Sequence, residues 1–420
     1  MIQWYKALSF TKKMLFAMAT GAILGVALES IQGQHDWINF YFSNGIFDVI
    51  GKLFVNSLKM LVVPLVFCSI TVGVSSLADI SLMGRIGFKS IVIYLFTTAV
   101  AISLALIAAI SIKPGQGLNI VSNSEFITKD APSLSNVITS IVPSNPVLAM
   151  ADGEMLQIIL FSILLGIAIT VSSSSGEPFK KGIQSLNSIM MSMVNIVMKF
   201  APLGVFCLIA KTFATQGIDM IVPLASYFLT VAFVLILHLF ITYGLLLKFL
   251  AKVSPFVFIK KMRDAIVFAF STASSNATIP VTLNTVEKKL GVNKSVASFT
   301  VPLGATINMD GTAIMQGVAT VFIATVYQID LTFVDYLAVI LTATMASIGT
   351  AGVPGVGLIM LTMVLTQVGL PVEGIALIIG IDRLLDMMRT AVNITGDSTV
   401  SIIVAKSEKS FKEKIFLSKE

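Results

Sequence analysis

A long apolar stretch near the C-terminus, Leu377 to Lys406, carries charged side chains where a membrane helix rarely has any. Polar residues recur in it at spacings of 4, 3, 4 and 4 and therefore share one helical face. This polar stripe consists of Asp382, Asp386, Arg389, Asn393 and Asp397. A charge at the bilayer centre costs roughly 2.5–3.5 kcal/mol and rarely faces lipid. The stripe predicts a polar interior site, although an ion-pair seam between packed helices would give the same pattern.

The composition places the chain in a membrane. Hydrophobic residues make up 56% and charged residues 12% of the 420 residues, and the mean hydropathy is +0.93, whereas soluble domains carry about 25% charged residues. At about 20 residues per span, this length holds about eight spanning helices plus re-entrant pieces. We expect an all-α integral membrane protein with spans at 14–30, 45–75, 88–112, 155–172, 186–211, 222–250, 296–325 and 374–405. Several exceed the bilayer length, so tilts or breaks are expected.

The charge distribution indicates the topology. The net charge of +6 could suggest a nucleic-acid partner, but basic residues gather in alternate loops. Lys12, Lys13, Lys260, Lys261 and Lys412 are examples, and the intervening loops are poorer in them. This pattern follows the positive-inside rule and places both termini on the cytoplasmic side of the cytoplasmic (inner) membrane. We expect a multi-pass protein without a nucleic-acid partner, whose first apolar run is not a cleaved signal.

Cysteine and histidine are too sparse for a disulfide framework or a His/Cys metal site. Cys68 and Cys207 stand alone in apolar runs, and His35 and His238 are the histidines of the sequence. His238 falls inside a predicted span. Two interpretations stay open for it: a proton relay, or a packed and hydrogen-bonded residue.

Two apolar segments are interrupted by small and polar residues, from Phe268 to Val281 and from Met345 to Met360. Irregular backbone at membrane depth is tolerated where it is buried in protein or lines a cavity. A pair of such segments is typical of the inverted repeats of transporters. We expect two re-entrant helical hairpins, the first opening inward between basic loops and the second opening outward. Flexible interhelical loops are the alternative.

A third interruption lies inside an apolar span, from Pro302 to Gly317. Asn308, Asp310, Gly311 and Thr312 are expected to unwind the helix and free backbone carbonyls. Carbonyl and carboxylate oxygens suit a hard cation, and Asp310 and Asp397 supply the anionic ones. The residue types alone do not separate sodium from protons.

Arg389 and Asp386 together suit a zwitterion that carries an additional carboxylate. The guanidinium matches a carboxylate bidentately, and Asp386 can accept an ammonium group. Helix N-termini at the hairpin tips would hold the main-chain carboxylate. An Asp386–Arg389 ion pair without a ligand is the alternative, since the i,i+3 spacing favours it.

These motifs resemble the dicarboxylate/amino acid:cation symporter family, the glutamate transporter family, with its archaeal and bacterial sodium/aspartate-glutamate symporters. The serine-rich first hairpin carries the resemblance together with NMDGT at 308–312, SIGTAGVPG at 347–355 and DMMRTAVNITGD at 386–397. VPSNP at 142–146 and MLQIILFSILLGIAI at 155–169 extend it, so that it covers nearly the whole chain.

The resemblance implies a homotrimer of independent elevator-type carriers. Residues 1–80 and 119–215, with the first, second, fourth and fifth helices, would form a scaffold that makes the trimer contact. Residues 81–118, with the third helix, and 216–420 would form the mobile transport unit. The latter holds the sixth to eighth helices and hairpins at about 255–290 and 333–370.

The resemblance also implies the binding residues. Those for substrate are Ser274, Ser275, Thr312, Val353, Gly357, Asp386, Arg389, Thr390 and Asn393. Those for one co-transported sodium ion are Gly304, Asn308, Asn393 and Asp397. A second sodium ion would take backbone oxygens of Thr306, Ser347, Ile348 and Thr350, and a third would take Tyr94, Thr97, Thr98, Asn308 and Asp310.

The chain departs from its family's pattern at a few positions. Some members have an arginine at the position of Ala273 or of Met387; here Arg383 is our candidate for that supporting role. Gln316 replaces a glutamate that handles the proton in potassium-coupled members, and Met388 is larger than the glycine of some members.

We therefore expect a sodium-coupled importer of L-aspartate or L-glutamate, and not an enzyme. The alternative is a proton- or sodium-coupled carrier of a C4-dicarboxylate or cystine with the same fold. An intramembrane aspartyl protease using Asp310 and Asp397 is disfavoured, because Ile394 breaks the required motif. A passive channel would not need two opposed hairpins.

Overall fold

The structure, a computed structural model, describes residues 10–32, 39–77, 84–118, 142–348, 350 and 352–418. These residues form helices and connecting loops, with one isolated bridge between Val292 and Phe411. The predicted all-α fold is confirmed for this part of the chain. Gly349 and Ala351 of the second-hairpin motif, and residues 33–38, 78–83 and 119–141, lie outside the described residues.

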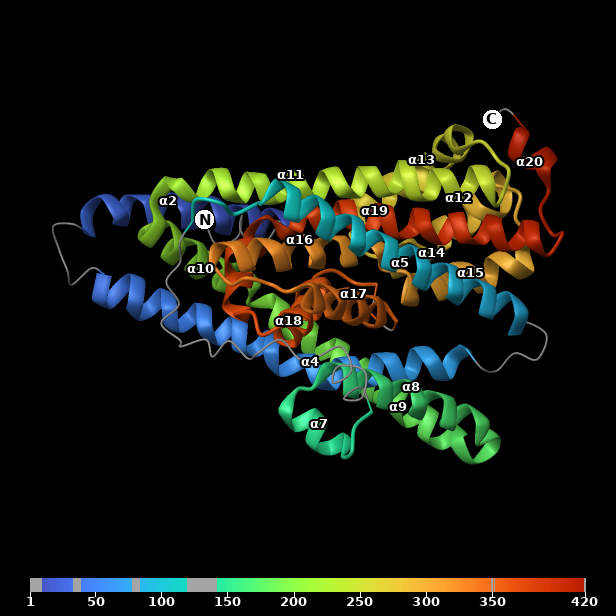
Figure 1. The fold of residues 1–420 in the computed structure, drawn as a ribbon, viewed down its shortest axis with the longest axis horizontal. Coiled ribbons are helices and arrows are strands. Elements are labelled where there is room, and N and C mark those ends of the chain that lie inside the picture. Colours follow the sequence, from blue (N-terminus) through green and yellow to red (C-terminus); the bar gives the residue numbers. More distant parts are fainter. Residues whose placement is uncertain are drawn as a thin grey trace, which may run out of the picture.

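The first half of the chain runs back and forth along the long axis of the molecule (Figure 1). Its elements are α2 (Phe10–Gln32), η1 (Asn39–Phe47), α4 (Asp48–Leu77), α5 (Gly84–Ile112), α7 (Pro146–Asp152), α8 (Met155–Val171), α9 (Ser173–Lys199) and α10 (Ala201–Gln216). The short η2 (Gly217–Met220) leads into α11 (Ile221–Leu237), which continues through the π-helix η3 (His238–Tyr243) into α12 (Gly244–Phe249).

The second half contains both interrupted segments and the polar stripe. Its elements are α13 (Pro255–Thr272), α14 (Ser275–Asn284), η4 (Thr285–Lys289), α15 (Lys294–Ile307), α16 (Asp310–Val326), α17 (Phe333–Ser347), α18 (Val356–Gln367), η5 (Val372–Gly374), α19 (Ile375–Ser407) and α20 (Glu413–Leu417).

The predicted spans fall mainly on helices, and two of them are interrupted: 296–325 breaks at Asn308 and Met309, and 186–211 bends between α9 and α10. The bend between α9 and α10 measures 49°, in line with the tilts or breaks expected of the longer spans. Pro202 lies in the first turn of α10, where its ring fits. Among the described residues, four helices are long and apolar enough to cross a membrane, or five if the bent pair counts as one span. The eight predicted spans stay a prediction.

Each predicted hairpin is a pair of helices packed against each other around a break. The first is α13 and α14, separated by Ala273 in the left-handed region (φ 50°) and by Ser274. The second is α17 and α18, whose connection ends at Gly355 with φ 86°. The helix–break–helix form is confirmed, and re-entry into a membrane stays a prediction.

The predicted interruption between Pro302 and Gly317 is narrower than expected. The helix breaks at Asn308 and Met309 alone, and Asp310, Gly311 and Thr312 already form the first turn of α16. α16 is the central helix of the fold, since its residues from Asp310 to Ala324 are all buried. It packs against α5, α11 and α19.

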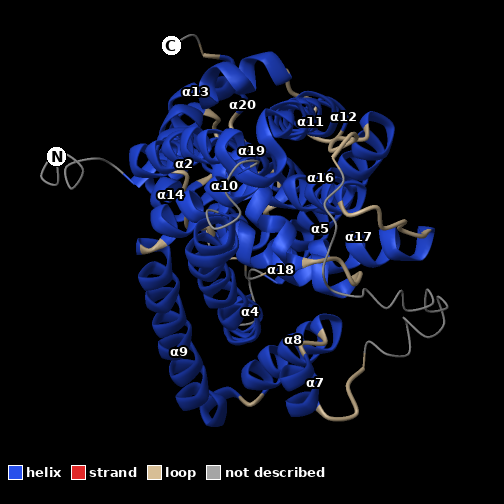
Figure 2. Ribbon diagram, turned by 90° about the vertical axis from the view of Figure 1, so that its left-hand side faces the viewer, coloured by secondary structure: helices blue, strands red, loops and turns tan. Residues whose placement is uncertain are grey.

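The helices form two groups. In one group, α4 contacts α8, α9 and α10, and α2 runs along α10 at close range because Gly25 has no side chain. A Cβ at Gly25 would lie 2.6 Å from the Ala210 carbonyl oxygen. In the other group, α5 and α11 surround α16, and α19 packs on α13, α15 and α16. Figure 2 shows α8 and α9 at the edge of the molecule, and α8 reaches the second group at α17 and α18.

The C-terminal end of α19 is fastened to the start of α5. Glu408 accepts a hydrogen bond from Lys89 Nζ at 2.6 Å and one from Arg85 Nη2 at 2.6 Å. These two cations, Lys89 before Arg85, hold the pKa of Glu408 below its usual value.

Candidate functional site

The polar stripe lies on α19 and is buried along its whole length. Arg389 and Asp397 are each 1% exposed, and Asp386, the most accessible member, is 9% exposed. The stripe passes the break between α15 and α16, and the tips of both hairpins approach it. Segments far apart in the sequence therefore supply one polar interior.

Arg389 is held by two carboxylates of its own helix. Nη1 donates to Asp382 Oδ1 at 2.6 Å, and Nη2 donates to Asp386 Oδ1 at 2.9 Å and to Asp382 Oδ2 at 3.3 Å. Nε is buried and has no hydrogen-bond partner within the described structure. The sequence analysis placed Asp382 in the stripe but gave it no role. Asp382 lies seven residues before Arg389, two helical turns away, and this spacing could have predicted their ion pair.

Asp386 is the meeting point of several groups. Its Oδ2 accepts from the Gly355 amide at 3.4 Å and lies 3.5 Å from Arg383 Nη1. Arg383 therefore lies beside Asp386, and its supporting role stays a prediction. The hydroxyl of Thr390 donates to the Asp386 carbonyl at 2.8 Å. A cavity of about 20 Å³ adjoins this cluster, lined in part by Asp382, Arg383, Asp386 and Gly355.

The two hairpin tips close on each other beside the stripe. Ser274 Oγ donates to the Gly352 carbonyl at 2.7 Å, and the Asn276 amide donates to the same oxygen at 3.1 Å. Ser275 is buried at the start of α14, and Val353 is half-buried in the second tip. Both tips thus lie at the site, as their assignment to substrate requires.

Gly357 and Thr312 line the space next to the guanidinium. A Cβ added at Gly357 would lie 3.2 Å from Thr312 Cγ2 and 3.5 Å from Arg389 Nη2. These two residues and Arg389 come from α18, α16 and α19. The structure therefore brings the predicted substrate residues of three helices together.

Asn308, in the break, joins the stripe to α15. Its Nδ2 donates to Asp397 Oδ1 at 2.9 Å and to the Asn393 carbonyl at 3.2 Å. Its Oδ1 is buried and has no partner within the described structure. The Asn393 side-chain oxygen accepts from the Gly311 amide at 2.7 Å. The break thus places an unused amide oxygen beside a buried carboxylate.

Tyr94 and Gly304 lie against Asp397. A Cβ at Gly304 would overlap the Asp397 carboxylate and lie 2.8 Å from Tyr94 Oη. Tyr94 Oη donates to the Thr300 carbonyl at 3.0 Å, and Thr97 Oγ1 donates to the Tyr94 carbonyl at 3.0 Å. Glycine at 304 is therefore what lets the carboxylate approach the α15 backbone.

Asp310 accepts two hydrogen bonds and contacts a histidine, and these three partners come from two other helical segments. Thr98 Oγ1 donates to Oδ1 at 2.5 Å, Tyr243 Oη donates to Oδ2 at 2.7 Å, and His238 Nε2 lies 3.2 Å from Oδ2. Sequence reasoning did not find Tyr243. His238 and Tyr243 are five residues apart, a spacing that a π-helix places on one side. His238 is therefore hydrogen-bonded, as one of its two interpretations required.

The residues of the second predicted sodium site lie at the ends of two helices. Ser347 ends α17, where its hydroxyl donates to the Ile307 carbonyl and accepts from the Met309 amide at 3.0 Å. Thr306 is in the last turn of α15, and Ile348 follows Ser347. Thr350 Oγ1 donates back to the Ala346 carbonyl. The second hairpin thus touches the α15–α16 break through Ser347.

A family model described as the sodium:dicarboxylate symporter family matches residues 10–407. A proton/glutamate-aspartate symporter of Escherichia coli (strain K12) is 35% identical over 98% of this chain and 96% of its own length. A proton/sodium-glutamate symport protein of Bacillus caldotenax is 35% identical over 94% of each chain. A C4-dicarboxylate transport protein of Bacillus subtilis (strain 168) is 32% identical over 87% of this chain and 88% of its own length.

A methyl group at position 304 tests whether Asp397 is part of a cation site. Gly304→Ala is expected to displace the Asp397 carboxylate and to remove at least half of the thermal stabilisation that sodium chloride gives over choline chloride. Gly244→Ala is the matched control, because a Cβ there meets no atom within 4 Å. An unchanged sodium-dependent shift in unfolding temperature in Gly304→Ala would contradict the assignment.

Proposed function

We propose that this chain, which belongs to the sodium:dicarboxylate symporter family, imports an acidic amino acid, L-aspartate or L-glutamate, together with sodium ions. Family and relatives are membrane symporters, not enzymes. The observation that carries the proposal is the buried Arg389 guanidinium next to Asp386 at the meeting point of both hairpin tips. A cation and an anion 2.9 Å apart match the charges of an acidic amino acid.

Substrate binding replaces the internal pair between Arg389 and Asp386. The substrate's side-chain carboxylate takes the guanidinium, and its ammonium group takes Asp386. Asp382 keeps its own two hydrogen bonds to Arg389 and holds the guanidinium in place. Ser274, Ser275 and the helix N-termini of α14 and α18 then receive the main-chain carboxylate. Thr312, Val353, Gly357, Thr390 and Asn393 complete the binding site.

Two buried carboxylates support cation coupling. In the described residues, Asp397 makes no ion pair, and its side chain accepts from Asn308. Asp310 is fully buried among Thr98, Tyr243 and His238. A buried uncompensated charge is strongly destabilising, so these groups favour a bound cation, and the surrounding oxygens suit sodium. The three predicted sodium sites are retained in full as part of the proposal.

The second candidate is a proton-coupled carrier of the same substrates or of a C4-dicarboxylate. The names of the relatives from Escherichia coli and Bacillus subtilis motivate it. The contact of His238 with Asp310 offers a place for a proton. Asp386 favours a substrate with an ammonium group over a dicarboxylate, and the oxygen-rich break favours sodium.

Arg389 tests the substrate assignment. Arg389→Ala is expected to reduce L-aspartate uptake into proteoliposomes at least a hundredfold, because losing a buried charged partner costs about 3–5 kcal/mol. Arg389→Lys, which keeps the charge without the planar fork, is expected to retain little uptake. The control is Arg85→Ala, which removes a cation whose side chain is 76% exposed. Undiminished uptake in Arg389→Ala would refute the assignment.

The two helix groups support movement of a transport unit along a scaffold, with the domain boundaries predicted above. α19 runs antiparallel to α10: Leu377 shares a cavity with Lys211 and Thr215, whereas Asp386 shares one with Met198 and Ala201. The start of the polar stripe, at Asp382 and Asp386, thus lies at the level where α9 joins α10. If both termini are cytoplasmic, the junction of α9 and α10 marks the cytoplasmic ends of α10 and α2. Figure 1 shows that α19 continues well beyond α2.

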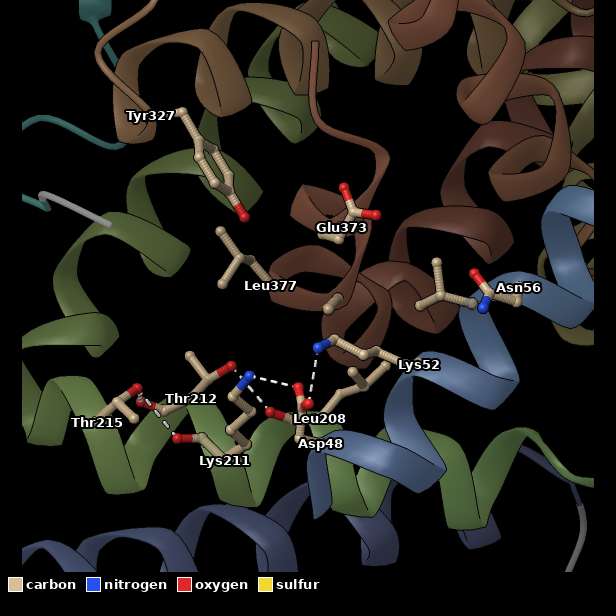
Figure 3. Close-up of a pocket in the computed structure, with 12 residues that line it drawn as sticks. Asp48, Lys52, Asn56, Leu208, Lys211, Thr212, Thr215, Tyr327, Glu373 and Leu377 are labelled. Carbon is tan, nitrogen blue, oxygen red and sulfur yellow. Dashed lines mark hydrogen bonds and ion pairs between the residues drawn. The ribbon is translucent and has the colours of Figure 1, made fainter. Parts of the chain in front are cut away.

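Cavities interrupt the packing between the two units. One of about 150 Å³ is lined by Asp48, Lys52 and Lys211 on α4 and α10, and by Tyr327 and Glu373 of the other unit (Figure 3). In that view Asp48 binds both lysines, and Tyr327 and Glu373 lie across the cavity from them. An apolar groove of about 630 Å³ lies between α2 and α10 on one side and α11 and α19 on the other. These cavities leave the interface between the proposed scaffold and transport unit loosely packed, which would allow the transport unit to slide along it.

A cross-link across the seam tests the movement. A Cβ at Gly380 would lie 3.0 Å from Met18 Cγ, so Met18→Cys with Gly380→Cys, in a chain without Cys68 and Cys207, should be bridged by mercury. The bridge is expected to stop uptake and to leave substrate-induced thermal stabilisation in place. Met18→Cys alone is the control. Full uptake by the bridged protein would contradict the sliding unit.

The surface of α9 supports the homotrimer. Its exposed apolar residues follow a heptad-like pattern along the helix and into α10: Phe179, Leu186, Ile189, Ile196, Phe200 and Leu203. Exposed polar side chains lie among them, including Gln184, Ser188, Ser192 and Asn195. Polar groups are unfavourable against lipid, so a second copy of the chain is the more suitable neighbour for this face.

A charge introduced into the exposed apolar face of α9 is expected to separate the subunits. Ile189→Glu should reduce the mass measured by light scattering in detergent from about three chains to one, since burying an unpaired carboxylate at an interface is costly. Leu245→Glu on α12 is the control, because Leu245 is 48% exposed and Ile189 is 54% exposed. A trimer that persists in Ile189→Glu, or a monomeric native chain, would count against this interface.

A further inference from the structure

Lys261 is buried at the base of the first hairpin, away from the stripe and on the side that the predicted topology places in the cytoplasm. It belongs to α13, and it is 6% exposed. Its ammonium group donates to the Ile415 carbonyl at 2.8 Å, to the Lys289 carbonyl at 3.0 Å and to Ser418 Oγ at 3.5 Å. One side chain thus connects the first arm, the end of the second arm and the C-terminal tail, which we define as residues 408–418.

The three acceptors explain why a lysine can be buried there. An ammonium group has three donors, and burying it without partners is strongly unfavourable. Lys289 is the last residue of η4, where helix carbonyls lack intrahelical partners and favour a cation. Among the described residues, the base supplies three oxygen acceptors for this ammonium group.

The tail is attached to the same base by its backbone. The Lys412 amide donates to the Gly291 carbonyl at 2.7 Å, and the Asn293 amide donates to the Ser410 carbonyl at 3.1 Å. A Cβ at Gly291 would lie 2.5 Å from the Lys412 carbonyl oxygen, so this approach needs glycine. Phe416 anchors the tail, since it is 1% exposed and its ring lies 5.8 Å from that of Phe411.

The second hairpin is fastened differently at its base. There Thr332 and Asp335 form a capping box within the start of one arm, α17. The first hairpin has in addition a cross-arm ion pair between Lys289 Nζ and Asp264 Oδ2 at 2.9 Å. The tail and Lys261 thus add constraint to the first hairpin in particular.

We propose that Lys261 is a positioning residue that, together with the C-terminal tail, clamps the two arms of the first hairpin at their base. The arms then move as one body, and the tip that carries Ser274 and Ser275 stays closed toward the cytoplasm while the site is loaded. The structural part of the proposal is independent of the substrate. Its effect on accumulation rests on the proposed function.

Amide hydrogen exchange of the full chain tests the clamp directly. Lys261→Met removes the ammonium group and keeps the apolar stem. Exchange at Asn293 and Lys412 is expected to accelerate about tenfold or more, since hydrogen bonds to charged groups contribute about 1.5–3 kcal/mol. Lys260→Met is the matched control, because Lys260 is exposed on the same helix. Native exchange rates at both amides in Lys261→Met would overturn the proposal.

Two further variants cover the case in which Lys261→Met does not fold. Phe416→Ala releases the tail with Lys261 intact and is expected to accelerate exchange at the same two amides. Lys261→Arg keeps a cation and is expected to restore part of the protection. Native protection at both amides in a folded Phe416→Ala protein would overturn the role of the tail.

Transport by the folded variant separates a functional role of Lys261 from a purely structural one. In proteoliposomes, folded Lys261→Met is expected to show an accumulation ratio for L-aspartate about threefold lower, with KM little changed, because a loosened hairpin leaks substrate. An unchanged ratio would overturn the functional part. If the unaltered protein accumulates no aspartate, the proposed substrate fails, while the exchange result still decides the clamp.

Discussion

A single buried guanidinium organises the interior of this protein. Arg389 can lie inside an apolar helix because Asp382 and Asp386 neutralise it from the same helix. That arrangement leaves Asp386 shared between Arg389, Arg383 and the second hairpin tip. The charges of the proposed zwitterionic substrate would then replace an existing contact, so its binding would not require new charges to be desolvated in the protein. The hairpin tips and the α16 N-terminus converge on this same region of α19.

The break between α15 and α16 supplies the second polar cluster of the interior, next to that of Arg389. It frees the Asn308 side chain to contact Asp397 and leaves the amide oxygen of Asn308 without a partner in the described structure. Gly304 allows Asp397 to approach α15, and Gly311 allows α16 to approach α19. Asp310 and Asp397 are buried beside this break, so the proposed coupling to cations depends on the same glycine-rich packing.

Much of this architecture was predictable because charges and helix breakers are rare in membrane segments. The stripe on α19 and both hairpin breaks follow from the spacing of a few residues. The 49° bend did not, because Pro202 is compatible with a helix start as well as a kink. Tyr243 was missed because it faces Asp310 only through a π-helix, which local sequence does not reveal. Asp382 pairs with Arg389 because of the rotamer that the Arg389 side chain adopts. Residue spacing alone did not show whether Arg389 pairs with Asp382, with Asp386 or with both.

The central claim, that an acidic amino acid moves with sodium, is tested most directly by L-aspartate uptake into proteoliposomes under separate inward gradients of sodium and of protons. The account predicts accumulation that requires the sodium gradient, persists when the proton gradient is collapsed, and is competed by L-glutamate. Accumulation driven by protons without sodium would contradict the cation assignment and favour the proton-coupled alternative.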